Sequence, residues 1–357
     1  MKKIPANKNS GFSLVEILVG MVIGMVGLII MMQIFSFVEG QKRTTTGTGD
    51  AQTTGVSAIY ALQRDLRYAG YGINALNVIG CPLDLGGGKT LPVLTHVVIN
   101  PANIPAGDPS TDVLLVSYGN GNGSTQGEVI INAAGTQLMM PSSLTYRVGD
   151  KVIATTARPM NVSCALRLAS VTSVSGQNLT LSSGDGAFEE GALFNLGSAP
   201  KILAYAVHGG NLTVCDYMAS NCTEDCTAAD GTCSSAWVPI ADNVVSLRAQ
   251  YGRDTTVPMN GSIDVWDQTT PVQPSPVDQE KYACLWVRAP AVRIAVVARN
   301  AQIEKEAVTP VAPAWYGSAT HPINLTATRT NWQHYRYRLF QTVVPIRNIP
   351  WMTLCPY

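Results

Sequence analysis

Residues 7–43 read NKNSGFSLVEILVGMVIGMVGLIIMMQIFSFVEGQKR, and this stretch decides the fold expected at the start of the chain. Between Phe12 and Val38 the only ionisable side chain is that of Glu16. Residues 17–38 alone exceed the roughly 20 apolar residues with which a helix crosses a bilayer. A cleaved signal peptide has a shorter apolar core and an A-x-A-like site, and the sequence shows neither. We therefore expect a retained membrane-spanning helix over residues 12–38.

The position of Glu16 at the start of this apolar run has two explanations. Ser13-x-x-Glu16 fits a capping box, in which the acid also suits the positive end of the helix dipole. Alternatively, a chain cut after Gly11 would begin at Phe12, and its α-amino group would lie four residues from the Glu16 carboxylate. The two explanations are compatible, and the spacing alone does not choose between them.

The stretch KNSGFSLVEILVGMVIG resembles the class III leader of type IV prepilins and pseudopilins. It combines a short basic leader, a Gly11-Phe12 junction, an acid at the fifth position of the cut chain and an uninterrupted apolar run. The resemblance implies that residues 1–11 form a leader peptide, which prepilin peptidase removes after Gly11. It also implies N-methylation of Phe12 and a role for Glu16 in docking the subunit into a growing filament.

Residues 39–72 are expected to continue the helix outside the membrane. Between Gly40 and Gly55 the sequence is rich in Thr and Gly, which predicts a weakened helix or a hinge. Helical spacing returns after Gly55, and Gly70 and Gly72 predict the stop. The predicted buried face consists of Val56, Ile59, Leu62 or Gln63, and Leu66, with Arg64, Asp65 and Arg67 largely on the opposite side. Two separate helices joined by a linker are the alternative.

Residues 73–357 are expected to form a β-rich head. Short runs of alternating apolar and polar residues dominate, as in DNVVSLRAQYG, where Val245, Leu247, Ala249 and Tyr251 share a face and Ser246, Arg248 and Gln250 lie on the other. TYRVGDKVIATTA predicts two runs joined at Gly149-Asp150, and CALRLASVTSVSGQNLTLSS alternates and predicts a turn at Ser175 to Asn178. The strand-helix-strand rhythm of a parallel sheet is missing from the sequence. The fold class is therefore α+β: a long N-terminal helix packed on a mostly antiparallel sheet head, in one lobe or two.

Eight cysteines accompany the membrane segment, which favours disulfides in an oxidising compartment. Their pairing stays open, because eight cysteines allow 105 connectivities. They are Cys81, Cys164, Cys215, Cys222, Cys226, Cys233, Cys284 and Cys355. The middle four, from Cys215 to Cys233, are an alternative zinc site, although their spacing lacks the C-x2-C form of common zinc sites.

Acidic residues near the same cysteines raise the question of a calcium site. They are Asp216, Glu224, Asp225 and Asp230. Calcium prefers several oxygen ligands, but the spacing matches no EF-hand loop. A loop pinned by disulfides and carrying solvated acids is the favoured interpretation, so we predict no metal.

Composition and motifs argue against other classes of protein. Lys plus Arg and Asp plus Glu number 24 each, so no excess of positive charge points to nucleic acid. Gly88-Lys89-Thr90 lacks the earlier glycine of a phosphate loop, and YGNGNGSTQG lacks the last glycine of a dinucleotide fingerprint. The sequence also lacks H-E-x-x-H and G-x-S-x-G. We therefore predict a protein that is not an enzyme and has no cofactor.

Several blocks of the chain are together similar to the PilW-like minor pilins of type IV pilus systems. The blocks are SAIYALQRDLRYAGYGI, DVLLVSYG, VVSLRAQYG, VRIAVVARN and YRYRLFQTVVPIRN. The resemblance implies a minor pilin that helps to prime and assemble the pilus and is incorporated near its tip. The implied partners are other minor pilins, the major pilin, prepilin peptidase, the inner-membrane assembly platform and a tip adhesin.

Location follows from the same features. Lys2, Lys3 and Lys8 precede the span, which favours a cytoplasmic N-terminus. The expected state is a single-pass protein of the bacterial inner membrane with its head in the periplasm, and later an extracellular pilus subunit. The alternatives are a J-type pseudopilin of type II secretion and, in another class, a membrane-anchored periplasmic enzyme or binding protein.

Overall fold

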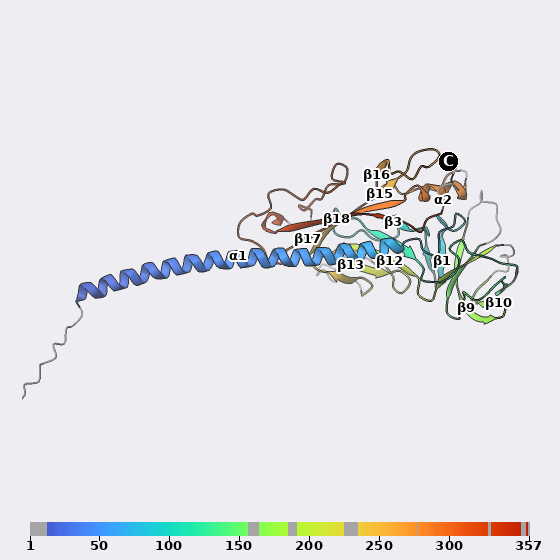
Figure 1. Cartoon of the computed structure of the whole chain (residues 1–357), viewed down its shortest axis with the longest axis horizontal. Helices are drawn as coiled ribbons and strands as arrows, with labels where there is room; N and C mark the ends of the chain where they lie inside the picture. The colour runs from blue at the N-terminus through green and yellow to red at the C-terminus, as the bar shows by residue number, and fades with distance from the viewer. Residues whose placement is uncertain are drawn as a thin grey trace, which may run out of the picture.

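One helix runs through the first fifth of the chain in the computed structural model, which describes residues 13–155, 164–184, 191–224, 235–275, 277–327, 330–350 and 355. Helix α1 (Leu14–Tyr68) is continuous over 55 residues and projects from the head as a rod (Figure 1). The predicted stop is confirmed, since Gly70 and Gly72 follow the helix with φ of +82° and +80°. The predictions of a hinge and of two helices joined by a linker are wrong, because the Thr- and Gly-rich stretch between Gly40 and Gly55 is helical throughout.

The head consists mainly of short strands. In chain order they are β1 (Leu83–Gly86), β2 (Lys89–Leu91), β3 (Val97–Ile99), β4 (Leu114–Tyr118), β5 (Glu128–Val129), β6 (Asn132–Ala134), β7 (Gln137–Met139), β8 (Lys151–Thr155), β9 (Leu166–Ser175), β10 (Asn178–Leu181), β11 (Ala192–Gly197), β12 (Lys201–His208), β13 (Asn211–Asp216), β14 (Val238–Ala241), β15 (Val244–Arg253), β16 (Val265–Asp267), β17 (Ala291–Arg299) and β18 (Tyr337–Pro345). A helix that the sequence did not reveal, α2 (Gln279–Val287), and a 3-10 turn, η1 (Trp332–His334), interrupt them.

These strands form three sheets. The first has nine strands with the order β5-β11-β8-β9-β10-β7-β6, and β1 joins it through β9. The second has the order β14-β13-β12-β4-β3, and the third β16-β15-β17-β18. Among the described strands, β1 and β9 are the one parallel pair. The α+β fold with a mostly antiparallel head is therefore confirmed.

The docked end of α1 belongs to the main core of the head. Leu62 and Leu66 are buried in one cluster with residues of the second sheet, such as Tyr205, and of the third, such as Val296 and Val344. Figure 1 shows β17 and β18 on one side of the helix and β12 and β13 on the other. Because both sides are covered, the helix is a structural element of the head and not a tether attached to it.

A second core lies away from α1, at the end of the head where Figure 1 places β9 and β10. It consists of eleven buried residues of the nine-stranded sheet and its connections, including Leu138, Val171, Leu179 and Leu193. These residues pack on one another and form a cluster separate from the main core.

Two details of the strand predictions are wrong. Val245 does not share a face with Leu247, because the register of β15 against β17 shifts between Val244 and Ser246. Val245 therefore packs in a small outer cluster with Trp315, while Val244 and Leu247 enter the main core. The run before Gly149-Asp150 is also not a strand, since β8 begins only at Lys151.

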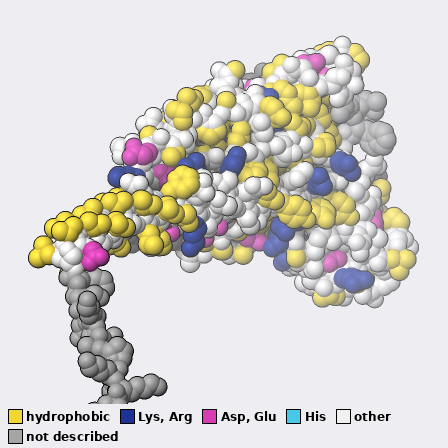
Figure 2. Space-filling model, turned by 60° about the vertical axis from the view of Figure 1, so that its left-hand side comes forward, with side chains coloured by type: hydrophobic (Ala, Val, Ile, Leu, Met, Phe, Trp, Pro, Cys, Tyr) yellow, Lys and Arg dark blue, Asp and Glu magenta, His cyan; other side chains and the backbone are white. Residues whose placement is uncertain are grey.

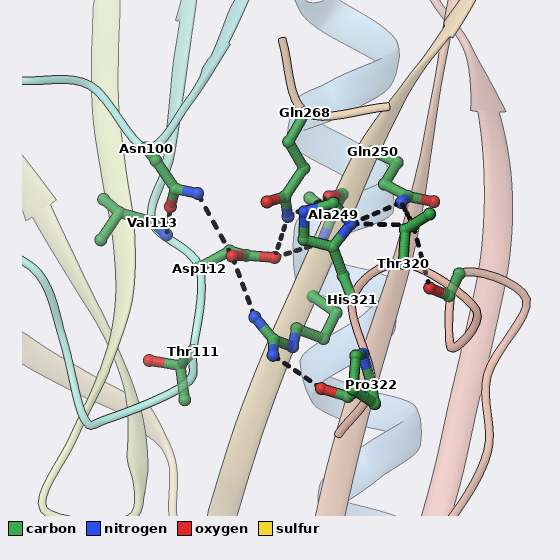
Figure 3. A network of polar contacts seen from close by, with 12 residues as sticks. Asn100, Thr111, Asp112, Val113, Ala249, Gln250, Gln268, Thr320, His321 and Pro322 are labelled. Atoms are coloured by element: carbon green, nitrogen blue, oxygen red, sulfur yellow. Dashed lines mark hydrogen bonds and ion pairs between the residues drawn. The ribbon is translucent and has the colours of Figure 1, made fainter. Parts of the chain in front are cut away.

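The polar face of β15, which carries Ser246, Arg248 and Gln250, is buried. Arg248 donates from Nη1 to an Asp112 oxygen at 3.2 Å and from Nη2 to the Pro322 carbonyl at 2.7 Å. Asn100 and Gln268 also donate to Asp112, at 3.2 and 2.6 Å (Figure 3). Because a buried charge must be paired and hydrogen-bonded, this network fixes the third sheet to the second.

Candidate assembly interface

The free half of α1, residues 14–38, is apolar and uncovered. Every residue in it is exposed except Gly27, which is half-buried. The large apolar side chains on it are Leu14, Val15, Ile17, Leu18, Val19, Met21, Val22, Ile23, Met25, Val26, Leu28, Ile29, Ile30, Met31, Met32, Ile34, Phe35, Phe37 and Val38. Figure 2 shows them as a continuous apolar rod that leads into the head.

This exposure requires a partner, because removing one large apolar side chain from water is worth about 1.5–3 kcal/mol. Within the described residues, α1 is the one helix long and apolar enough to cross a membrane, with a mean hydropathy of 2.6 over its most apolar window. Lipid tails or similar helices are the surroundings that stabilise such a segment.

The capping box at the start of α1 is confirmed. The Ser13 backbone N–H donates to Oε2 of Glu16 at 3.0 Å, and the Val15 N–H donates to Oγ of Ser13 at 3.3 Å. This local role does not exclude the second explanation, in which Glu16 meets a terminal amine. Gly11 and Phe12, on which that explanation depends, lie outside the described residues.

Small residues bring the docked half of α1 close to the third sheet. Gly47, Ala51, Gly55 and Ala58 recur every three or four residues on the side that faces the head. A Cβ on Gly55 would lie 2.0 Å from the Phe340 ring, and one on Gly47 would lie 3.1 Å from Asn300. The glycines that suggested a hinge therefore provide close packing. Their helical spacing was the signal that could have revealed it.

The predicted division of residues 56–67 into a buried and an exposed face was partly wrong. Leu62 and Leu66 are buried as expected, but Val56 is half exposed and Asp65, expected on the solvent side, is 1% exposed. The physical reason is that Ala51, Gly55 and Ala58 face the head. This rotates the contact stripe away from Val56 and toward Asp65.

Asp65 fixes the end of α1 to the second sheet. Tyr118 and Tyr205 donate their hydroxyls to its carboxylate, the first at 3.1 Å. Arg64 donates to the same group from Nε at 2.9 Å and from Nη2 at 3.2 Å. Burial, together with the Asp65 charge, raises the pKa of both tyrosines, so both hydroxyls stay protonated donors.

Six cysteines pair in the head. The disulfides are Cys81–Cys164, Cys215–Cys222 and Cys284–Cys355. The first and third close long loops of 83 and 71 residues, which constrains the unfolded chain. Cys226 and Cys233 lie outside the described residues.

The structure tests part of the alternative metal sites. Because Cys215 and Cys222 are joined to each other, they are not the free thiolates that a zinc site of the four middle cysteines needs. Asp216 pairs with Lys201 at 2.8 Å. Within the described residues, no group of three His, Cys, Asp or Glu side chains could hold a metal ion. Asp225 and Asp230 lie outside them.

Comparison with known protein families gave two matches. Residues 217–348 match the family described as Type IV Pilus-assembly protein W, and residues 6–32 match the Prokaryotic N-terminal methylation motif. The first match contains three of the five blocks noted in the sequence, from VVSLRAQYG to the end of β18, whereas SAIYALQRDLRYAGYGI and DVLLVSYG lie before it. No curated protein and no solved structure matches the chain.

Proposed function

The chain is a PilW-like minor pilin that takes part in type IV pilus assembly, and from this premise we propose its path. Prepilin peptidase cuts after Gly11, Phe12 is methylated, and the helix holds the subunit in the inner membrane with its head in the periplasm. The subunit then joins other minor pilins, primes the pilus and stays near its tip. The observation that carries this proposal is the exposed apolar half of α1, which continues without a break into the docked half.

In this proposal each segment has one task. Residues 1–11 are the leader, residues 12–38 the membrane and filament-core helix, residues 39–72 its soluble continuation and residues 73–357 the head. The continuity of α1 supports this division, because one helix joins the free half directly to Gly55 and Asp65, which contact the head. Other minor pilins, the major pilin, the assembly platform and a tip adhesin are the proposed partners.

Glu16 sets the register of the subunit among its neighbours. Packing of apolar helices is weakly directional, so it does not by itself select one axial position. A carboxylate in apolar surroundings is costly unless it meets a positive charge. The methylated amine of Phe12, on the same chain or a neighbouring one, supplies that charge at one register only.

The first test replaces Glu16 with Ala. We expect cleavage after Gly11 to continue, while the amount of the protein in sheared pili falls about tenfold, the effect of about 1.4 kcal/mol on an equilibrium. Quantitative immunoblots of sheared pili and membranes measure both. Glu39→Ala, which removes an acid just beyond the apolar run, is the matched control and should keep normal incorporation. Normal incorporation of the Glu16→Ala protein would remove the role assigned to this acid.

A second test is mass spectrometry of the native protein recovered from membranes and pili. The expected N-terminal peptide begins at a methylated Phe12. A peptide that still carries residues 1–11, followed by an unmodified Phe12, would overturn the filament proposal and favour a membrane-tethered protein of another kind.

A further inference from the structure

One loop of the head reaches back along α1 toward the free half of the helix. This loop, residues 301–311, follows β17. Arg336 connects it to the helix, since its Nε donates to Glu304 at 3.0 Å and its Nη2 donates to Thr44 Oγ1 at 3.3 Å. Glu304 and helix residues from Ser36 to Thr45 line one shallow, open hollow beside the helix.

The loop is held in a fixed shape. The Glu304 N–H donates to the His334 carbonyl at 2.8 Å, and the Val308 and Thr309 N–H groups donate to the Gln333 carbonyl at 2.9 and 3.0 Å. Residues 305–307 lie between these anchors and are exposed. The segment therefore projects between two points that are hydrogen-bonded to the η1 turn.

The position of the loop along the helix axis is close to the expected surface of a membrane. The apolar run ends at Val38, and Thr44, the helix contact of Arg336, follows six residues later. At 1.5 Å per residue this is about 9 Å. The headgroup layer on each side of a hydrocarbon core is about 5–8 Å thick. Thr44 therefore lies just beyond this layer, but Glu304 of the loop also lines the same hollow as Ser36 and Phe37, at the end of the apolar run. When the free half of α1 lies in a bilayer, the part of the loop around Glu304 is therefore level with the headgroups.

The exposed side chains of the loop suit that layer. Ile303 and Val311 are 49% and 75% exposed, and apolar side chains of this kind insert at the boundary of headgroups and acyl chains. Between them, Lys305 and Glu306 are adjacent, oppositely charged and exposed. A zwitterionic headgroup offers a phosphate to the first and an ammonium to the second.

We propose that residues 301–311 form a membrane-docking loop that rests on zwitterionic lipid headgroups while the subunit waits in the membrane. The inference rests on the proposed anchoring of α1. Docking holds the head at a fixed tilt to the membrane, because loop and helix then contact the bilayer at two points. Entry into the filament requires the loop to leave the lipid surface.

Photo-crosslinking of the full-length protein in vesicles of phosphatidylethanolamine and phosphatidylglycerol tests this. The photoreactive residue p-benzoyl-L-phenylalanine replaces Ile303 in one protein and Leu144 in a matched control. Leu144 is 92% exposed and lies beside the turn between β9 and β10, far from the free half of α1 (Figure 1). A third protein carries the probe in place of Ile23, within the apolar run, and reports on anchoring.

The expected result is a mass shift of one lipid molecule at positions 23 and 303, and none above background at position 144. Lipid attached at position 23 but not at position 303 would overturn the docking loop and leave the anchoring intact. Equal labelling at positions 303 and 144 would also overturn it, as would the attachment of protein instead of lipid at position 303. Failure at position 23 would overturn the anchoring and the loop together.

Discussion

The two halves of α1 use opposite kinds of residue to make contact. The free half, residues 14–38, carries large apolar side chains that no described part of the head covers. The docked half touches the head mainly through small residues, Gly47, Ala51, Gly55 and Ala58, and then through Leu62 and Leu66. Large apolar side chains therefore lie where the helix contacts partners outside the chain. Small residues lie where it packs against its own head.

The difference follows from the surroundings of each half. Lipid and neighbouring helices adapt to a surface, so large apolar side chains gain the most by burial there. The docked half instead faces a fixed ring, Phe340, at a distance that leaves no room for a Cβ. A rigid sheet sets the shape of the helix surface, and the helix meets it with glycine.

The substitution with the largest expected effect is Asp65→Ala, which destabilises the contact between the docked half of α1 and the head. The change leaves the buried hydroxyl of Tyr205 and the half-buried hydroxyl of Tyr118 without their acceptor. We expect a loss of about 3–5 kcal/mol in the free energy of unfolding of the head. Urea titration of the detergent-solubilised protein measures it. Asp50→Ala, at an exposed position of the same helix, should change this free energy little, and equal losses in both proteins would contradict the anchor.

The next effect concerns pH at the docked end of the helix. His96 lies beside Gly70, and its full burial lowers the pKa of the imidazole to about 4. The unfolded chain, with a pKa near 6.5, then binds more protons between these values. Stability is therefore complete above pH 6.5 and falls by about 3 kcal/mol as pH drops to about 4.

Urea titrations at pH 7 and pH 4.5 measure this slope. His96→Leu should reduce it, while His321→Gln, at a half-buried position near the surface of the third sheet, should keep it. A slope that is the same with and without His96 would show that other groups cause the dependence.

The smallest and sharpest effect compares two glycines of one helix. Gly55→Ala should destabilise the head by about 1–3 kcal/mol, because the new Cβ overlaps the Phe340 ring. Gly49→Ala meets nothing within 4 Å and should stabilise by about 0.5–1 kcal/mol, the usual gain of Ala over Gly in a helix. Thermal unfolding of both proteins, compared with the unchanged protein, measures these two changes in stability. A stabilising Gly55→Ala would mean that the helix is not closely packed there.

Sequence patterns succeeded where one local property decides the structure. The helix stop at Gly70, the hairpin of β9 and β10 and the capping box of Ser13 and Glu16 each depend on neighbours in the chain. Patterns failed at Val245 and at Asp65, and they did not show that the polar face of β15 is buried. In these places a bulge, two distant tyrosines and the loop that carries Pro322 decided what was buried.

The sequence by itself determined an apolar rod with an acid near its start, a processing motif and a β-rich head, because composition and spacing along one segment suffice for these. Only the tertiary structure decided that the Thr- and Gly-rich stretch is a continuous helix and that Asp65 is an internal anchor. It also decided how the six described cysteines pair, and that Glu304 lies close to the end of the apolar run. Each of these depends on which distant surface a residue meets, and that is set by the packing of three sheets around one helix.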